Sequence, residues 1–198
     1  MTTQDRLHQG RPARMPPVTT VQPVQIRTDE FDRMTDAGLF DGRRVELVEG
    51  TLYEMPPMAT PHLLVLVRLQ RMLAPLNAEG RLLVQVPVQV PDFDEPEPDL
   101  AVLRAPLAEH RPTATECTLA IEVSDSSRLG FDRQRKVPAY LRGGVPTVWI
   151  VNVPARQVEV YQAAGQAPRI YPRDAHLEVE GIAVDLATLF ANLERVAG

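Results

Sequence analysis

The stretch CTLAIEVSDSS, residues 117–127, decides the fold. It is a short run of leucine and β-branched residues that ends in Ser and Asp, a pattern typical of a largely buried strand. Glu122 lies inside this run, with apolar neighbours on both sides. An isolated buried carboxylate is costly unless it is paired, hydrogen-bonded or bound to a metal. The stretch therefore predicts a buried strand whose acid needs a partner.

Two more buried strands flank this one along the chain. EPDLAVLRA, residues 97–105, precedes it, and PTVWIVNV, residues 146–153, follows it. Between the second and third strands, the sequence predicts a helix from about Asp132 to Arg142 that is closed by two glycines. The order of strand, strand, helix and strand predicts an α/β domain with a mixed sheet.

The remaining segments extend this domain in both directions. Residues 43–55 predict a hairpin that turns at Glu49 and Gly50, and residues 60–77 predict a helix with Pro61 at its first position. Because Pro87 lies inside the alternating run 81–93, we expect this strand to be an edge strand or to contain a bulge. We also predict a helix over 28–38, a strand over 156–163 and a short amphipathic helix over 184–196. We expect residues 1–24, which are polar and rich in Arg and Pro, to form a disordered arm before a single domain over 25–198.

Composition narrows the class of protein. The chain of 198 residues is 44% hydrophobic and has no apolar run of the roughly 20 residues that a membrane span needs, so we expect no membrane segment. The unpaired Cys117 agrees with a cytoplasmic location. A net charge of −5 argues against broad coating of nucleic acid. A local basic cluster, interpreted from charge alone as a solvated helix face, comprises Arg128, Arg133, Arg135, Lys136 and Arg142.

Three acids and one lysine form the candidate site. Asp99 follows a proline at the start of a buried strand, and Glu46 lies in the apolar segment VELVEG. If Glu46, Asp99 and Glu122 converge, a divalent cation is the simplest way to stabilise all three as anions, although any single acid is more often solvated at a strand end. Lys136 is the only lysine in a chain with 20 arginines, and its predicted helix can pack over the sheet.

These segments resemble a known family. EPDLAVL, LAIEVSDSS, DRQRKVPAY and GVPTVWIV together are similar to the Uma-type endonucleases, a branch of the PD-(D/E)XK, restriction-endonuclease-like superfamily. The resemblance implies a restriction-endonuclease-like core, a central mixed β-sheet flanked by helices. It also implies that Asp99, Glu122 and Glu46 bind Mg²⁺ or Mn²⁺ and that Lys136 assists phosphodiester hydrolysis. One position departs from the pattern, because Ser124 stands where the superfamily has its lysine. The resemblance suggests that Lys136 reaches the same space from the next helix.

The sequence thus predicts a metal-dependent endonuclease that acts on DNA, with a homodimer as the expected assembly. Two alternatives stay open: a catalytically silent module of the same fold that binds DNA or protein, and an enzyme that hydrolyses a smaller phosphate ester. His62, at the start of the helix over 60–77, is either a structural residue or a participant in the site.

Overall fold

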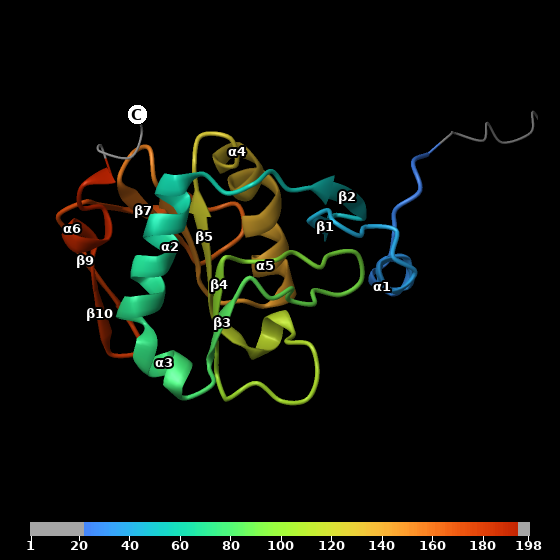
Figure 1. Ribbon diagram of the computed structural model, residues 1–198, viewed down its shortest axis with the longest axis horizontal. Helices are drawn as coiled ribbons and strands as arrows, with labels where there is room; N and C mark the ends of the chain where they lie inside the picture. The colour runs from blue at the N-terminus through green and yellow to red at the C-terminus, as the bar shows by residue number, and fades with distance from the viewer. Residues whose placement is uncertain (1–21, 194–198) are drawn as a thin grey trace, which may run out of the picture.

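A six-stranded mixed sheet forms the centre of the protein in the computed structural model, which describes residues 22–193 (Figure 1). The strands lie in the order β3 (Leu82–Val84), β4 (Leu100–Leu103), β5 (Cys117–Ser124), β6 (Val148–Asn152), β7 (Gln157–Tyr161) and β8 (Arg169–Pro172). Only β5 and β6 pair in parallel among these six. Almost all of the predicted arm, residues 1–21, lies outside the described part of the chain.

The parallel pair is joined by a helical crossover of three consecutive pieces. These are α4 (Leu129–Phe131), a π-helical turn (Asp132–Lys136) and α5 (Val137–Gly143). The wide turn comes just before Pro138, which has no N–H to continue an α-helical ladder. Gly144 ends the helix with φ +100, a left-handed conformation that glycine adopts without steric cost.

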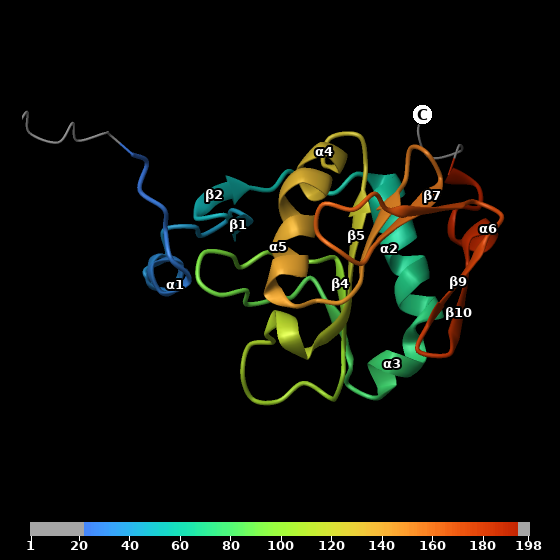
Figure 2. The same cartoon turned by 180° about the vertical axis from the view of Figure 1, so that it is seen from behind.

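Helices cover both faces of the sheet (Figures 1 and 2). On one face lie α2 (Thr60–Met72), α3 (Ala74–Ala78), α6 (Leu186–Leu189) and a small sheet of β9 (His176–Val179) and β10 (Ile182–Asp185). Their apolar side chains, such as Leu66 and Leu69, form a buried cluster with Val123 and Val151. On the other face, Val137 and Tyr140 of the crossover pack in a second cluster with Ile150. The crossover therefore lies directly over the strand that carries Glu122.

A hairpin attaches to the far side of the crossover (Figure 2). It follows α1 (Thr28–Asp36) and consists of β1 (Val45–Val48) and β2 (Thr51–Glu54). Glu49 and Gly50 turn the chain with φ +52 and +70, as the primed turns of two-residue hairpins require. The amide of Gly50 donates to the carbonyl of Phe93, and Glu95 pairs with Leu47, so the hairpin is tied to the loop before β4. This attachment holds Glu46 beside the main sheet.

Some predicted boundaries are wrong. The strand expected over 81–93 ends at Val84, because Gln85 has φ +50 and leaves the extended region. The described part of the C-terminal helix covers only Leu186–Leu189. The strands β8, β9 and β10 were not predicted. In the described residues, no helix has the length and apolar character needed to cross a membrane.

Candidate active site

Asp99, the residue just before β4, lies close to Glu122 in the neighbouring strand β5. Leu100 pairs with Ile121 in the antiparallel β4–β5 ladder, so the position before Leu100, which is Asp99, continues the register opposite Glu122. Both acids are buried, each with only 2% of its surface exposed. The carboxylate of Asp99 accepts a 2.8 Å hydrogen bond from the amide of Val123, the residue after Glu122. The two predicted acids are therefore neighbours across the ladder.

Lys136 reaches Glu122 from the crossover helix. Its Nζ lies 2.8 Å from Oε1 of Glu122 and 2.9 Å from Oε2 of Glu46, and it donates to the carbonyl of Glu97 at 2.8 Å. The Lys136 side chain is 3% exposed, so the three contacts of its ammonium replace the water it would otherwise bind. The structure thus brings together Lys136, Glu122 and Glu46, which come from three separate segments.

Two further contacts fix the acids that face Lys136. The hydroxyl of Tyr140, one turn along the same helix, donates to Oε1 of Glu122 at 2.7 Å. The amide of Glu97 donates to Oε2 of Glu46 at 3.2 Å. Both carboxylates therefore hold their positions through hydrogen bonds as well as charge.

Asp99 has a different set of partners. Its Oδ1 lies 3.1 Å from Nε2 of His62 at the start of α2, and 3.4 Å from the side-chain amide of Gln85. His62 is fully buried. Burial alone would raise the pKa of Asp99, but the hydrogen bond and charge of His62, together with Lys136, lower it below its usual value. Asp99 is therefore ionised at neutral pH.

A fourth carboxylate, Asp132, belongs to the same cluster and was missed in the sequence. Its Oδ2 accepts a 2.6 Å hydrogen bond from the hydroxyl of Ser124, and its side chain is buried. The residue that departs from the superfamily pattern thus holds an acid one helical turn before Lys136. The spacing of four residues between Asp132 and Lys136 was a signal for a shared helix face.

Charge is unbalanced in this buried cluster. Burial and the neighbouring carboxylates raise the pKa of Glu122, and burial raises that of Asp132 to about 6. Burial acts to lower the pKa of Lys136, but Glu122 and Glu46 outweigh it and raise the pKa above its usual value. The ammonium therefore stays charged. The four carboxylates that share it are Glu46, Asp99, Glu122 and Asp132.

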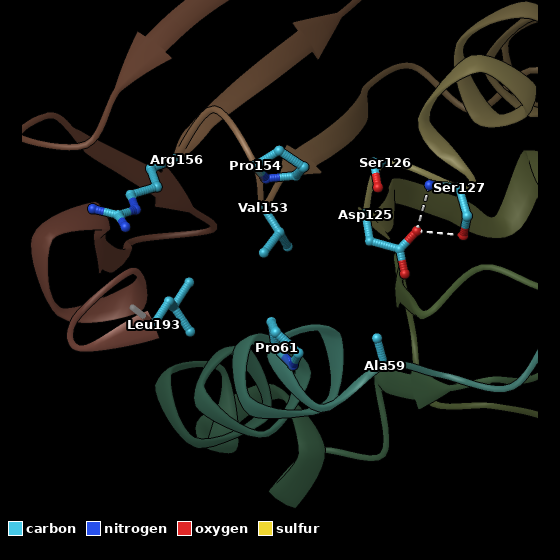
Figure 3. A pocket seen from close by; sticks show the side chains of 9 residues that line it. All are labelled: Ala59, Pro61, Asp125, Ser126, Ser127, Val153, Pro154, Arg156 and Leu193. Atoms are coloured by element: carbon cyan, nitrogen blue, oxygen red, sulfur yellow. Dashed lines mark hydrogen bonds between the residues drawn. The ribbon is translucent and has the colours of Figure 1, made fainter. Parts of the chain in front are cut away.

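One cavity borders the cluster, and a second lies at one end of the sheet. One of about 260 Å³ is bordered by Glu46 and Glu97 and opens between α1 and the hairpin. The other, of about 540 Å³, lies at the carboxyl ends of β5 and β6 (Figure 3). Its wall includes Pro61, beside His62, and Asp125, beside Ser124, while Val153, Pro154 and Leu193 give it an apolar surface.

The predicted basic cluster does not form an unpaired cationic face. Arg133 is bound to Glu159, Arg135 to Glu49, and Arg142 lies 3.4 Å from Asp94. Lys136 is buried among acids rather than solvated. The interpretation of this cluster as a solvated helix face therefore holds for the partly exposed Arg133, Arg135 and Arg142 and is wrong for Lys136 and for Arg128, which is also buried.

The donor chemistry of the cluster fits a divalent cation, since carboxylate oxygens are the ligands that Mg²⁺ and Mn²⁺ prefer. Across residues 22–193, however, no three His, Cys, Asp or Glu side chains are grouped so that they could hold a metal ion together. The Lys136 ammonium lies between Glu46 and Glu122. A metal would therefore share its ligands with Lys136.

Fold and site together define an α/β protein with a restriction-endonuclease-like core. A solved structure with the same fold is described as "a putative nuclease belonging to DUF820 from Anabaena variabilis ATCC 29413"; it is 16% identical, with a TM-score of 0.66, and the match covers 85% of this chain and 98% of that one. Residues 28–191 match the model of the Uma2 family, described as "Putative restriction endonuclease", so the chain belongs to that family. The comparison with curated proteins found no match.

Proposed function

We propose that the protein is an endonuclease that hydrolyses DNA phosphodiester bonds with the help of Mg²⁺ or Mn²⁺. The observation that supports this most directly is the buried ammonium of Lys136, which contacts the carboxylates of Glu46 and Glu122 and interacts through charge with Asp132 and Asp99. Such a cluster has excess negative charge, and a divalent cation is the usual partner that lets buried carboxylates stay ionised. Membership of a family described as restriction endonucleases agrees with this activity.

The residues divide into two roles. Asp99 and Glu122, with Glu46 at the border, would hold the metal, which would polarise the phosphate and lower the pKa of a bound water. Lys136 supplies a fixed positive charge in a site with little water, where it can stabilise the charge that builds up on the phosphate. Tyr140 and the carbonyl of Glu97 keep Glu122 and Lys136 in place.

The test combines cleavage with metal binding. We expect supercoiled plasmid to be cut with Mg²⁺ or Mn²⁺ and left intact with EDTA. Asp99→Asn and Glu122→Gln should abolish cutting and also reduce the rise in melting temperature that the metal produces in the wild type. Glu159→Gln is the matched control, because Glu159 is a buried carboxylate that is bound to Arg133 instead. Equal metal-induced stabilisation in all variants would place the ions elsewhere.

A second candidate is a catalytically silent module of the same fold. The observation that favours it is the pairing of the basic cluster with acids, which leaves little free positive charge for DNA. Binding of DNA or of a protein without cleavage in either metal would support it. Cleavage of a small phosphodiester but not of plasmid would instead support the smaller substrate class.

We also propose a homodimer, since cutting both strands of a duplex suits two sites related by a twofold axis. Light scattering during size-exclusion chromatography, with and without a DNA duplex, measures the mass directly. A monomeric mass under both conditions would exclude the dimer.

A further inference from the structure

The side chains of the candidate site are closed off from solvent. Asp99 and Glu122 are each 2% exposed, and Lys136 is 3% exposed. The ammonium of Lys136 already has three acceptors, so a DNA phosphate cannot reach it in this arrangement. The proposed reaction therefore requires one of the elements around Lys136 to move.

One of these elements lies at the edge of the molecule. Residues 28–54, here called the lid, comprise α1 and the hairpin of β1 and β2. Figures 1 and 2 show the lid beside the crossover and outside the layers that cover the sheet. The lid supplies Glu46, one of the two carboxylates that contact Lys136. Outward movement of the lid would therefore withdraw Glu46 and uncover the ammonium.

The lid has little share in the hydrophobic core. In the described part of the chain, none of the residues 28–54 belongs to either of the two buried apolar clusters that pack on the sheet. The lid has contacts of its own, between the paired strands β1 and β2 and between the rings of Phe31 and Phe40, whose centroids are 5.6 Å apart. A segment with few contacts to the core opens at a lower free energy than the core itself. The lid can therefore move as a unit while the sheet stays folded.

The contacts that hold the lid closed are mainly polar. Glu49, at the hairpin turn, pairs with Arg135 and, at 3.5 Å, with Arg142, both of which belong to the crossover. Such partly exposed ion pairs contribute little to stability and weaken with salt. Opening also breaks the backbone hydrogen bonds to the loop before β4 and exposes the buried Leu47 and Val48, so the closed form is the main one.

The linkers at both ends of the lid allow it to turn. Residues 22–27 before it and 55–59 after it form no helix or strand. In the second linker, the carbonyl of Pro56 accepts a 2.6 Å hydrogen bond from Arg128, at the start of the crossover. This bond fixes the chain to the body of the protein just beyond the end of β2. The lid can therefore turn about the residues next to Pro56.

We propose that the lid opens away from the crossover to admit a phosphodiester of DNA to Lys136 and then recloses, which returns Glu46 to the cluster. In the open form the ammonium has one acceptor fewer and can bind a phosphate oxygen instead. The role in admitting DNA rests on the proposed function, whereas the opening itself does not.

Lys136 reports the opening, because it is the only lysine in the chain. An amine-reactive ester modifies its side chain only when it is uncovered, and the mass of the peptide that contains it measures the rate. We expect Glu49→Gln to speed this modification by about 2–10-fold, since it removes two ion pairs of the closed lid. Glu79→Gln is the matched control, because Glu79 pairs with Arg81 outside the lid and the rate should stay the same. An unchanged rate in Glu49→Gln would overturn the inference.

Hydrogen exchange followed by mass spectrometry separates movement of the lid from unfolding. We expect the amides of β1 and β2 to exchange faster than those of β5 and β6, and we expect high salt to speed exchange in β1 and β2 alone. Exchange of all four strands at one rate would mean that the lid opens only when the whole protein unfolds, which contradicts the inference.

A disulfide between the lid and the body tests the link to cleavage. Leu47 and Glu95 are partners in an antiparallel bridge, where Cα atoms lie about 4.5–5.5 Å apart, within the range of a disulfide. We expect oxidised Leu47→Cys/Glu95→Cys to resist modification of Lys136 and to leave plasmid uncut, and we expect reduction to restore both. Modification of the oxidised form at the reduced rate would show that no lid opens, and cutting at the reduced rate would exclude its role in admitting DNA. If the wild type does not cut DNA, the proposed function fails, while modification and exchange still decide whether the lid opens.

Discussion

The ammonium of Lys136 is enclosed so closely that its size matters as well as its charge. Three acceptors surround Nζ at 2.8–2.9 Å, and the side chain is 3% exposed. A guanidinium is planar and larger, and it spreads its charge over five donors. The position therefore selects a compact ammonium, which gives a physical reason for one lysine among 20 arginines.

The substitution Lys136→Arg tests this selection. We expect the variant to fold, with a free energy of unfolding lower by about 1–3 kcal/mol from overpacking, and to lose cleavage by about 100-fold or more. Urea titration and single-turnover cleavage at saturating Mg²⁺ measure the two effects. Arg135→Lys is the control, because Arg135 is half exposed and both quantities should change little. Near-wild-type cleavage in Lys136→Arg would show that the ammonium is not required.

Asp132 gives the cluster a pH dependence that can be isolated. Burial raises its pKa from 3.8 to about 6, so the folded protein binds this proton more tightly than the unfolded chain. The stabilisation is complete below pH 3.8 and is lost as the pH rises through 6, by about 3 kcal/mol in all. We expect Asp132→Asn to remove this loss, so that the variant gains stability relative to the wild type between pH 4 and pH 7.5. Urea unfolding of both proteins across this range measures the difference, and a constant difference would contradict the assignment.

At the scale of elements, the hairpin of β1 and β2 controls the position of Glu46. A Cβ at Gly50 would lie 2.6 Å from Cβ of Gln25, whereas one at Gly42 would meet nothing within 4 Å. Both glycines have positive φ, +70 and +77, so alanine is strained at both. The backbone strain is therefore common to both variants, and the difference between their free energies of unfolding measures the effect of the clash with Gln25.

We expect Gly50→Ala to lower the free energy of unfolding by about 1–3 kcal/mol more than Gly42→Ala does. It should also weaken cleavage, because Glu46 lies four residues before the displaced turn. Urea unfolding and plasmid cleavage of the two variants measure these effects. Equal losses would mean that Gln25 moves aside without disturbing the hairpin.

Elements with strong local signals could be predicted from the sequence. The hairpin turn at Glu49 and Gly50, the apolar strands around Asp99 and Glu122, and the helix after Pro61 each have a pattern set by their own residues. The strand β8 has no such pattern, since it is an exposed edge, and β9 and β10 have only four residues each. The π-helical turn follows from how the crossover accommodates Pro138, which residue periodicity does not reveal.

The sequence predicted individual residues of the candidate site but not the contacts between them. The three acids and Lys136 were found as exceptions within apolar or arginine-rich surroundings. The bond between His62 and Asp99 joins residues 37 positions apart, and the bond between Ser124 and Asp132 depends on how the crossover packs. Such pairings are set by tertiary structure, so the sequence named His62 without naming its partner.

For the whole molecule, the paired arginines predict a weak dependence of DNA binding on salt. Three partly exposed arginines, Arg133, Arg135 and Arg142, are already held in ion pairs, so together they can make at most about three phosphate contacts. Three phosphate contacts correspond to a slope of about −2.7 in log affinity against log salt. Fluorescence anisotropy with a labelled duplex between 50 and 200 mM KCl, in Ca²⁺, measures this slope. A slope near −8 would mean that a larger basic surface forms.

Because the chain has a single lysine and it is buried, cleavage after this lysine can be used to measure unfolding. A protease that cuts only after lysine has one target in the chain, the bond between Lys136 and Val137. In the native protein this bond is inside the crossover helix and its side chain is enclosed, so digestion requires the crossover to open. The rate at which fragments 1–136 and 137–198 appear would therefore report how often the crossover helix opens.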